Sequence, residues 1–361
     1  MRNIVSVLFK YTKSMKKLLM TGGGSAGHVM PNMALLPALK ERFDVSYMGT
    51  DGIEKDIVRR SNIPFYEIEC PKLVRGSVLK NLSLPLRLFK SVKLARRGLL
   101  VIQPDVVFSK GGYVSLPVAI AAKKLKIPVL SHESDLKPGL ANKLISRYSS
   151  VVLTSFPETA DQILKGKYAG SPVRGELFGA DRKTALAAYG FDGTRPVLLV
   201  FGGGSGSAAL NAAVRENLFT LSQKYDILHV CGKGNLVQSN VKNYVQKEFE
   251  NDMGAAYAAA DLVISRAGSN TLFEILALKK RALVVPLANK RSRGDQIENA
   301  AYFESRGLLH VLPERGLAEK DALTDAISAA FADGSLSENL REASFTAGNE
   351  AIRREIEKCC K

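Results

Sequence analysis

Two glycine-rich segments carry the residue types of an anion-binding loop. Residues 22–28 read Gly-Gly-Gly-Ser-Ala-Gly-His, and residues 202–207 read Gly-Gly-Gly-Ser-Gly-Ser. Each segment follows a short apolar run, at 17–21 or 196–201, and precedes a run with helical periodicity. At such a strand–loop–helix junction, backbone N–H groups and the helix dipole favour an anion, and glycine lets a phosphate approach closely. The matching pair predicts two α/β domains that face each other across a cleft.

Two side chains are candidates for a catalytic or ligand-binding role. His28 ends the first loop at a helix start, where it can act as a general base, steady an anion or simply complete the helix start. Glu274 lies one turn inside the helix that follows residues 265–271. Its two oxygens suit a sugar diol because they can accept from both hydroxyls, although a glutamate is also favourable near any helix N-terminus.

Further polar clusters follow other apolar runs. They are the Gly-Gly-Tyr run at 111–113, the His-Glu-Ser-Asp run at 132–135, and the patch of residues 291–296 with Asn299. Because open α/β sheets bind ligands at the carboxyl ends of their strands, these clusters are candidate cleft residues; ordinary loop capping is the alternative. The sequence has no Gly-Lys-Ser or Gly-Lys-Thr of a P-loop and no Asp-x-Asp pair, and it matches the dinucleotide fingerprint only loosely. We therefore expect no cofactor and no metal.

Alternating strand and helix patterns position these residues. Strands are expected at 17–21, 43–49, 64–70, 105–110, 128–132 and 151–156, and again at 196–201, 225–231, 262–265, 282–286 and 308–312. Helices are expected at 29–42, 52–60, 114–125, 208–224, 270–278 and 296–305, and through the tail from 320 to 358. Continuous apolar strands separated by helices indicate parallel sheets covered on both faces.

The alternation also divides the chain. Residues 1–14 are expected to be a disordered extension, because the first strand begins just after Met15. Residues 15–170 form the first domain and 194–335 the second, with a linker at 171–193, where glycine and proline interrupt the pattern. Residues 336–361 form a C-terminal helical segment.

The chain is strongly basic, with a formal net charge of +16, which implies an anionic partner. No acidic residue occurs between Glu69 and Asp105, and the pattern there predicts a basic amphipathic helix. One arc of that helix holds Leu84, Leu88, Val92, Ala95 and Leu99, and another holds Arg87, Lys90, Lys93 and Arg97. The basic face is either solvated or rests on anionic lipid. Nucleic acid is disfavoured, since aromatic residues make up only 7% of the chain and tryptophan is absent.

Cysteine usage indicates a reducing, cytosolic compartment. Cys70 and Cys231 are isolated and Cys359 and Cys360 are adjacent, which is neither a disulfide framework nor a zinc pattern. No apolar run approaches the roughly 18 residues that a membrane span needs.

Several motifs occur together along the chain, from about Met15 to the C-terminal helix. They are residues 23–31, 111–115, 132–133, 138–143, 171–174, 202–211, 252–253, 265–268 with Glu274, and Gln296 with 299–300. This set resembles the MurG family of N-acetylglucosaminyltransferases. The resemblance implies the GT-B fold: two Rossmann-like parallel-sheet domains facing a cleft, with a C-terminal helix returning toward the first domain. It also implies inverting transfer of N-acetylglucosamine from UDP-GlcNAc to the C4 hydroxyl of the muramyl sugar of undecaprenyl-linked lipid I, giving lipid II.

The resemblance gives roles to individual residues. In the first domain, which would hold the acceptor and face an anionic membrane surface, Ser25, Ala26 and Gly27 would lie close to the donor sugar and the acceptor diphosphate, and His28 would be the base. In the second, UDP-GlcNAc-binding domain, Glu274 would hold the ribose hydroxyls. Asp135 would contact the donor sugar and Gln296 its hydroxyls, while Ser269, Asn270 and Thr271 would lie at the diphosphate. Arg174 would lie at the uracil side, and Phe249 and the Glu250 backbone would flank the uracil. The remaining substrate-binding residues would be Tyr113, Gly204, Ser205 and Asn211. The protein would be peripheral at the cytoplasmic face of the bacterial membrane.

The chain departs from the family pattern at three places. Gly204 stands where many members have serine, so that Ser205 or the backbone alone would serve. Asp135 stands where others have asparagine, which replaces a neutral amide by a carboxylate. The loop before Gln296 is longer here, so either Asp295 or Gln296 would contact the donor sugar.

Other functions remain open on the sequence alone. A related GT-B enzyme could use another acceptor, such as diacylglycerol. A UDP-GlcNAc 2-epimerase shares the architecture and needs no acceptor. A non-enzymatic basic scaffold on a membrane or on nucleic acid would leave the paired glycine loops unexplained.

Overall fold

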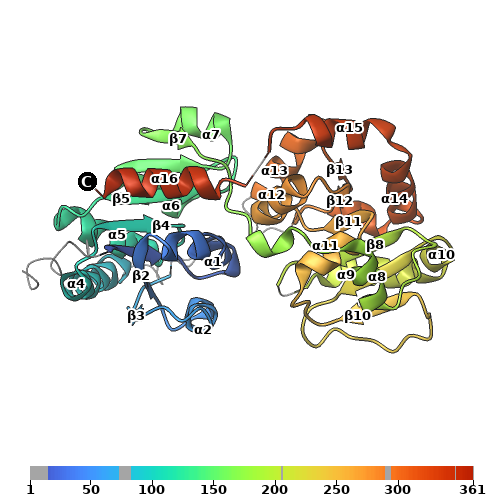
Figure 1. The fold of residues 1–361 in the computed structure, drawn as a ribbon, viewed down its shortest axis with the longest axis horizontal. Coiled ribbons are helices and arrows are strands. Elements are labelled where there is room, and N and C mark those ends of the chain that lie inside the picture. The colour runs from blue at the N-terminus through green and yellow to red at the C-terminus, as the bar shows by residue number, and fades with distance from the viewer. Residues whose placement is uncertain (1–14, 73–82, 205, 289–293, 346, 361) are drawn as a thin grey trace, which may run out of the picture.

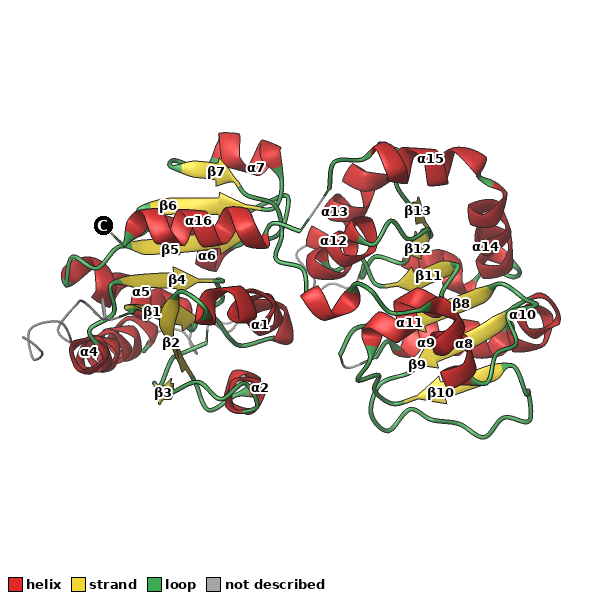
Figure 2. Ribbon diagram, viewed as in Figure 1, coloured by secondary structure: helices red, strands yellow, loops and turns green. Residues whose placement is uncertain are grey.

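Two parallel β-sheets, each with helices on both faces, form two domains that lie side by side (Figure 1, Figure 2). The computed structural model describes residues 15–72, 83–204, 206–288, 294–345 and 347–360. The expected extension at 1–14 lies outside the described residues. The expected architecture of two Rossmann-like parallel-sheet domains is confirmed.

The first domain is built on a seven-stranded sheet with the strand order β3-β2-β1-β4-β5-β6-β7. Its strands are β1 (Lys16–Thr21), β2 (Phe43–Gly49), β3 (Phe65–Glu67), β4 (Val106–Ser109), β5 (Val129–Glu133), β6 (Val151–Thr154) and β7 (Gly166–Tyr168). Its helices are α1 (Ala26–Lys40), α2 (Ile53–Arg59), α4 (Leu84–Ile102), α5 (Ser115–Lys124), α6 (Leu140–Ser146) and α7 (Pro157–Gln162).

The second domain repeats this plan with six strands in the order β10-β9-β8-β11-β12-β13. They are β8 (Val197–Phe201), β9 (Asp226–Val230), β10 (Tyr244–Lys247), β11 (Leu262–Ser265), β12 (Ala282–Val284) and β13 (His310–Val311). The helices are α8 (Arg182–Tyr189), α9 (Ala208–Glu216), α10 (Leu218–Lys224), α11 (Met253–Ala259), α12 (Ser269–Ala277), α13 (Asp295–Glu304), α14 (Ala322–Ala332) and α15 (Gly334–Glu342), with 3₁₀ turns η1 (Gly175–Leu177) and η2 (Glu314–Ala318).

Neighbouring residues of the central strands pack into different cores. Leu18 and Met20 lie in a cluster with residues of α1, whereas Leu19 lies in a cluster with residues of α4 and α5. In the second sheet, Leu198 and Leu199 divide between two clusters in the same way. Because both faces are covered, the middle residues of these two central strands are apolar on both sides. The strand order reverses beside β1 and β8, which opens a crevice at the carboxyl end where each glycine loop begins.

The chain crosses between the domains twice, and the two crossings are hydrogen-bonded to each other. Ser171, after β7, forms a parallel bridge with Ala347, and its carbonyl accepts from Gly348 N at 2.8 Å. The Asn349 side chain bonds both the N–H and the carbonyl of Val173, each at 2.9 Å. The final helix, α16 (Asn349–Cys359), then packs on the first domain beside α1 (Figure 1). The expected return of the C-terminal helix is confirmed.

An aromatic cluster also joins the domains. The Phe156 ring, which follows β6 of the first domain, lies 5.1 Å from the ring of Phe273, 5.0 Å from that of Tyr302 and 5.4 Å from that of Phe303. These three partners belong to α12 and α13 of the second domain. The Tyr302 hydroxyl reaches back to the Glu158 carboxylate at 2.9 Å. The cluster is fully buried at Phe156 and Phe303, so it holds the two domains together by apolar burial.

The expected linker at 171–193 is in part a structural element of the second domain. It contains η1 and α8, and the side chains of Ala185, Leu186 and Tyr189 are buried in the second core. Asp181 caps α8 by accepting from Thr184 N at 2.7 Å. The sequence has the Asp-x-x-Thr capping pattern at 181–184, but the glycines on either side of this short helix favour irregular structure.

Helix continuity was predicted wrongly at two places. The helix expected at 208–224 is broken at Asn217, whose side-chain amide donates to Ala213 O at 2.9 Å and competes with the helical backbone. The tail expected to be helical from 320 to 358 contains three helices, because Asp333 caps α15 and the described residues between α15 and α16 belong to the second crossing. Strands β7 and β10 were not predicted, because they have only three and four residues and no extended apolar run.

Shortening one buried side chain of α16 tests how firmly the returning helix is held. Ile352 is fully buried against the first domain, so we expect Ile352→Ala to lower the free energy of unfolding by about 2–5 kcal/mol. Urea unfolding followed by circular dichroism measures the change. The matched control is Arg354→Ala on the exposed side of the same helix, for which about 0.5 kcal/mol or less is expected. Equal stability of the two variants would show that α16 contributes little to the first domain.

Candidate active site

Loops at the carboxyl ends of the two sheets meet between the domains. The Asn270 side chain, at the start of α12, donates from Nδ2 to Gly27 O of the first glycine loop at 3.0 Å. The neighbouring Ser269 hydroxyl donates to the carbonyl of Ser134, which follows β5. The structure therefore brings three of the predicted site residues together, from segments more than 130 positions apart in sequence.

A second set of contacts joins residues 133–136, here called the 133–136 loop, to α13. Asn299 Oδ1 accepts from Leu136 N at 2.9 Å, and Asn299 Nδ2 donates to Asp135 Oδ1 at 3.1 Å. Asp135, expected at the donor sugar, therefore lies at the domain interface. Its carboxylate oxygen accepts a hydrogen bond there that an asparagine oxygen could also accept.

A buried carboxylate lies beneath the first glycine loop. Glu54 of α2 accepts from Gly24 N at 3.2 Å and from both the backbone N–H and the hydroxyl of Thr50. A Cβ at Gly23 would lie 2.5 Å from Glu54 Oε1, so only glycine permits this packing. The Gly24 N–H is therefore already hydrogen-bonded to a side chain of the protein. The sequence analysis missed Glu54, because it lies 30 residues from Gly24 in a separate helix.

His28 lies in the first turn of α1, with its ring beside the turn of Gly111 and Gly112. Its Nδ1 is 3.2 Å from the carbonyl oxygen of Lys110. Since a carbonyl can only accept, Nδ1 is the donor, and in the neutral imidazole Nε2 then carries the lone pair that a general base requires. Gly112 has a φ of +80°, and a Cβ there would lie 2.4 Å from Gly23 O, so this turn also needs glycine.

Tyr113 closes the other side of the first glycine loop. Gly24, at a φ of +81°, lies so close to the Tyr113 ring that a Cβ would be 2.4 Å from Cε1. The Tyr113 ring, predicted as a site residue, packs directly on the first glycine loop. Ser25 precedes α1 in extended conformation, and α1 begins at Ala26 rather than at the predicted residue 29.

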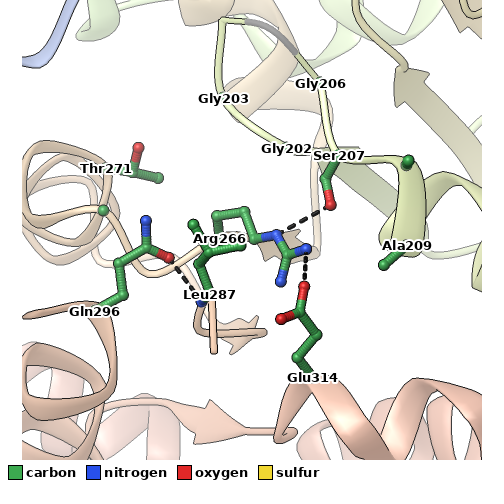
Figure 3. A pocket seen from close by; sticks show the side chains of 12 residues that line it. Gly202, Gly203, Gly206, Ser207, Ala209, Arg266, Thr271, Leu287, Gln296 and Glu314 are labelled. Atoms are coloured by element: carbon green, nitrogen blue, oxygen red, sulfur yellow. Dashed lines mark hydrogen bonds and ion pairs between the residues drawn. The ribbon is translucent and has the colours of Figure 1, made fainter. Parts of the chain in front are cut away.

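The second glycine loop lines a pocket with a volume of about 450 Å³ (Figure 3). The start of α9, Thr271 of α12 and Gln296 of α13 form other parts of its wall. Arg266, which follows β11, crosses the wall: Nε donates to Ser207 Oγ at 3.0 Å, Nη1 donates to Val285 O at 3.1 Å, and Nη2 pairs with Glu314. The Glu314 carboxylate offsets the Arg266 charge within the lining, so it is the N-terminal ends of the two helices bordering the pocket that suit it to an anionic ligand.

Gln296 and Asp295 occupy different places relative to this pocket. Gln296 lines the pocket, where its Oε1 accepts from Leu287 N at 2.9 Å, and Asp295 is the first residue of α13 outside the lining. The preceding residues 289–293, part of the longer loop, lie outside the described residues. Arg266 and Glu314 were not predicted as site residues. The position of Arg266 directly after a strand was the available sign, whereas Glu314 pairs with it from 48 residues away.

Asn211 supports the second glycine loop from below and does not line the pocket. Its Oδ1 is 3.0 Å from His229 Nε2, and its Nδ2 donates to Cys231 O at 2.9 Å. Burial lowers the pKa of His229 to about 4, so the imidazole is neutral, and Tyr244 bonds its other nitrogen at 2.9 Å. Gly206 lies above, at a φ of +75°, where a Cβ would be 2.0 Å from Cys231 O. This network fixes the base of the loop, and the Asn211 side chain is committed to it.

Glu274 and Arg174 are brought together although they are 100 residues apart in sequence. Arg174 donates from Nε to Glu274 Oε1 at 3.0 Å and from Nη2 to Oε2 at 3.4 Å. The Tyr257 hydroxyl donates to the same Oε2 at 3.3 Å. Burial, together with the Glu274 charge, raises the pKa of Tyr257 well above its usual value, so the phenol stays a donor. Tyr257 was not predicted from the sequence, because it lies in the short helix α11 beyond the 252–253 motif.

The remaining predicted residues are placed as follows. The Phe249 ring is 62% exposed after β10, whereas the Glu250 side chain is buried, bonds Tyr189 and Lys247, and leaves only its backbone for a ligand. Gly204 is exposed at the tip of the second loop, outside the pocket lining, and Ser205 lies outside the described residues. Within the described ranges, no group of three His, Cys, Asp or Glu side chains is arranged to hold a metal ion.

Two family models match the two domains. Residues 18–154 match the glycosyltransferase family 28 N-terminal domain, and residues 197–355 match the glycosyltransferase family 28 C-terminal domain. The solved structure of Acinetobacter baumannii MurG is similar, with a TM-score of 0.75 and 26% sequence identity over 95% of this chain and 99% of that chain. The calicheamicin glycosyltransferase shares the fold, with a TM-score of 0.69 at 15% identity over 95% of this chain and 98% of that chain.

Sequence relatives agree with the structural comparison. A protein of Clostridium botulinum (strain Loch Maree / Type A3) is 47% identical over 85% of this chain and 88% of its own length. A protein of Clostridium tetani (strain Massachusetts / E88) is 43% identical over 95% of this chain and 98% of its own length. Both are named UDP-N-acetylglucosamine–N-acetylmuramyl-(pentapeptide) pyrophosphoryl-undecaprenol N-acetylglucosamine transferase. This chain therefore belongs to the MurG family of N-acetylglucosaminyltransferases, with the two domains of glycosyltransferase family 28.

Proposed function

We propose that this chain transfers N-acetylglucosamine from UDP-GlcNAc to the C4 hydroxyl of the muramyl sugar of undecaprenyl-linked lipid I, forming lipid II with inversion at the anomeric carbon. The observation that carries the proposal is that relatives 43–47% identical over most of both chains bear one transferase name. The activity would serve peptidoglycan synthesis and, through it, cell-wall growth, cell shape and division.

The second domain has groups suited to a uridine diphosphate sugar. The Glu274 carboxylate, held by Arg174 and Tyr257, is the proposed acceptor for the ribose hydroxyls, with Arg174 toward the uracil. The exposed Phe249 ring is available to flank the base. The diphosphate would lie near the helix-start amides of Ser269, Asn270 and Thr271, where N–H groups and the helix dipole stabilise negative charge. Gln296 would bind the sugar hydroxyls.

The first domain would hold the acceptor and supply the base. The C4 oxygen attacks the anomeric carbon as the bond from that carbon to the diphosphate oxygen breaks, and UDP leaves with the bonding electrons. The hydroxyl proton passes to Nε2 of His28, the nitrogen left with the lone pair by the Lys110 contact. Attack on the face opposite the leaving group inverts the configuration. Closure of the domains would exclude water, which could otherwise hydrolyse the donor.

The direct test is a transfer assay with purified protein and radiolabelled UDP-GlcNAc. With lipid I as acceptor we expect labelled lipid II, and with diacylglycerol as acceptor no labelled product. Transfer to diacylglycerol alone would identify a glycolipid synthase instead. Conversion of the donor to its manno epimer without any acceptor would identify a UDP-GlcNAc 2-epimerase.

Neutralising Glu274 tests the donor site. Glu274→Gln keeps the shape but leaves one acceptor oxygen in place of two, so we expect the KM for UDP-GlcNAc to rise about tenfold or more, which corresponds to about 1.4 kcal/mol. Steady-state kinetics at saturating lipid I measures it. Glu176→Gln is the matched control, because this exposed carboxylate also touches Arg174, at 3.4 Å, and is predicted to leave KM unchanged. Wild-type kinetics in Glu274→Gln would remove the ribose assignment.

We also propose that α4 rests on an anionic membrane surface at the cytoplasmic face. Val92, Ala95 and Leu99 are buried, as the periodicity predicts, and the four cations of the predicted basic face are exposed. The structure adds large apolar side chains on the exposed side: Leu86, Phe89, Leu100 and Val101, which are 50–74% exposed. Cations beside exposed apolar groups suit the boundary between headgroups and acyl chains. No helix of the described chain has the length and apolarity to span a bilayer.

Vesicle sedimentation tests the α4 surface. Each cation near an anionic surface contributes about 1 kcal/mol, so we expect Lys93→Ala/Arg97→Ala to weaken binding to phosphatidylglycerol vesicles about thirtyfold. Phe89→Ser should weaken it as well, and phosphatidylcholine vesicles should bind every variant poorly. Lys233→Ala/Lys242→Ala removes two exposed lysines of the second domain and serves as the control for net charge. An equal loss in this control would assign binding to overall charge and not to α4.

A further inference from the structure

Three side chains beneath the first glycine loop have no role in the function proposed above. Asn32 of α1, Tyr47 of β2 and Glu54 of α2 are each fully buried. The Tyr47 hydroxyl donates to Gly22 O at 2.8 Å and accepts from Asn32 Nδ2 at 3.1 Å. Burial raises the pKa of Tyr47 well above its usual value, so the phenol stays a donor. Glu54 Oε2 accepts from Gly24 N at 3.2 Å, so the loop is held from below at two places.

Glu54 bridges the first glycine loop and the turn between β2 and α2. While Oε2 bonds Gly24, Oε1 accepts from the Thr50 N–H at 3.0 Å and from the Thr50 hydroxyl. Two glycines leave room for the side chain: a Cβ at Gly49 would lie 2.9 Å from Glu54 Cγ, and one at Gly52 would lie 3.1 Å from Oε2. A carboxylate has an acceptor oxygen for each of its two partners, whereas an amide has only one. The site therefore suits glutamate and not glutamine.

The place of the loop determines the place of His28. A Cβ at Gly22 would lie 2.5 Å from His28 O, so the start of the loop packs directly on the first turn of α1. His28 N also donates to Ser25 O at 3.1 Å. Because the backbone runs from Gly24 through Ser25 into this turn, loss of the Glu54 contact would be passed on to His28. Reacting groups that are misplaced by about 1 Å can lose about two orders of magnitude in rate.

We propose that Glu54 is a positioning residue for the transfer reaction, and that its bond to Gly24 holds the first glycine loop so that His28 keeps its place between the domains. Glu54 is fully buried, so it acts through the loop and not on a substrate. The inference rests on the proposed function for its kinetic consequence, but the state of the loop can be measured without any activity. Because UDP is proposed to bind the second domain, its affinity should not depend on Glu54.

Glu54→Gln tests the role in catalysis. Thr50 offers two donors and Gly24 one, so the single remaining oxygen should face Thr50 and the Gly24 contact should be lost. We expect kcat to fall about tenfold or more, while the Kd for UDP, measured by calorimetry, changes less than about twofold. Glu67→Gln is the matched control with wild-type kinetics, because it makes the same charge change at an exposed carboxylate that pairs with Lys55 at 2.7 Å. An unchanged kcat in Glu54→Gln, an equal loss in Glu67→Gln, or a parallel loss of UDP affinity would overturn the proposal.

Hydrogen exchange of the Gly24 amide, resolved by NMR, reports the loop directly. Gly24 is exposed, so protection of its amide depends on the bond to Glu54. We expect slow exchange in the wild type, exchange about tenfold faster or more in Glu54→Gln, and the wild-type rate in Glu67→Gln. Unprotected exchange in the wild type would overturn the positioning role, and this measurement decides even if Glu54→Gln does not fold. A wild-type enzyme inactive on lipid I that still showed the expected exchange pattern would overturn the proposed function and leave the hold of Glu54 on the loop intact.

Discussion

Burial of one aromatic ring, that of Phe156, fixes how the two domains face each other. The ring leaves the end of β6 and packs among Phe273, Tyr302 and Phe303, on the two helices whose N-terminal ends border the donor side. Fully burying such a side chain contributes about 1.5–3 kcal/mol, more than the roughly 0.5–1.5 kcal/mol of one neutral hydrogen bond. Apolar contact therefore sets the distance between the domains. The polar contacts of Ser269, Asn270 and Asn299 then set the alignment within that distance.

The two glycine loops are alike in sequence and differ in what their backbones do. In the first loop, the Gly24 N–H is bonded to Glu54 of the same domain, and a carboxylate thus stands beside a position where a phosphate would otherwise fit. The base of the second loop is the neutral network of Asn211 and His229, and the one carboxylate among the described residues that line its pocket, Glu314, is paired with Arg266. This difference supports the assignment of the nucleotide to the second domain. It arises from residues outside both loops.

The parts of the site with local sequence patterns could be predicted, and the parts that depend on distant partners could not. The glycine loops, the start of α12 and the histidine after the first loop have characteristic spacings that backbone geometry imposes, so the sequence identified them. Glu54, Arg266 and Glu314 each have a partner 30 to 59 positions away, and nothing in the local sequence indicates those partners. Asn211 occurs within a motif, but its amide is used for support and does not line the pocket. The two parallel sheets followed from the alternation of elements, while the short helix α8 and the edge strands β7 and β10 were missed because such short segments carry little periodicity.

The paired crossings between the domains have a mechanical consequence. Ser171 and Ala347 run in parallel, joined by backbone and Asn349 hydrogen bonds, so the two covalent connections behave as one two-stranded strap. A single tether permits swivelling as well as bending, whereas a strap of two strands resists torsion and leaves bending across its width as the soft motion. Substrate entry and product escape would then follow a clamshell path with one dominant angle. The loops on the two sides of the cleft would return to the same relative position each time the domains close.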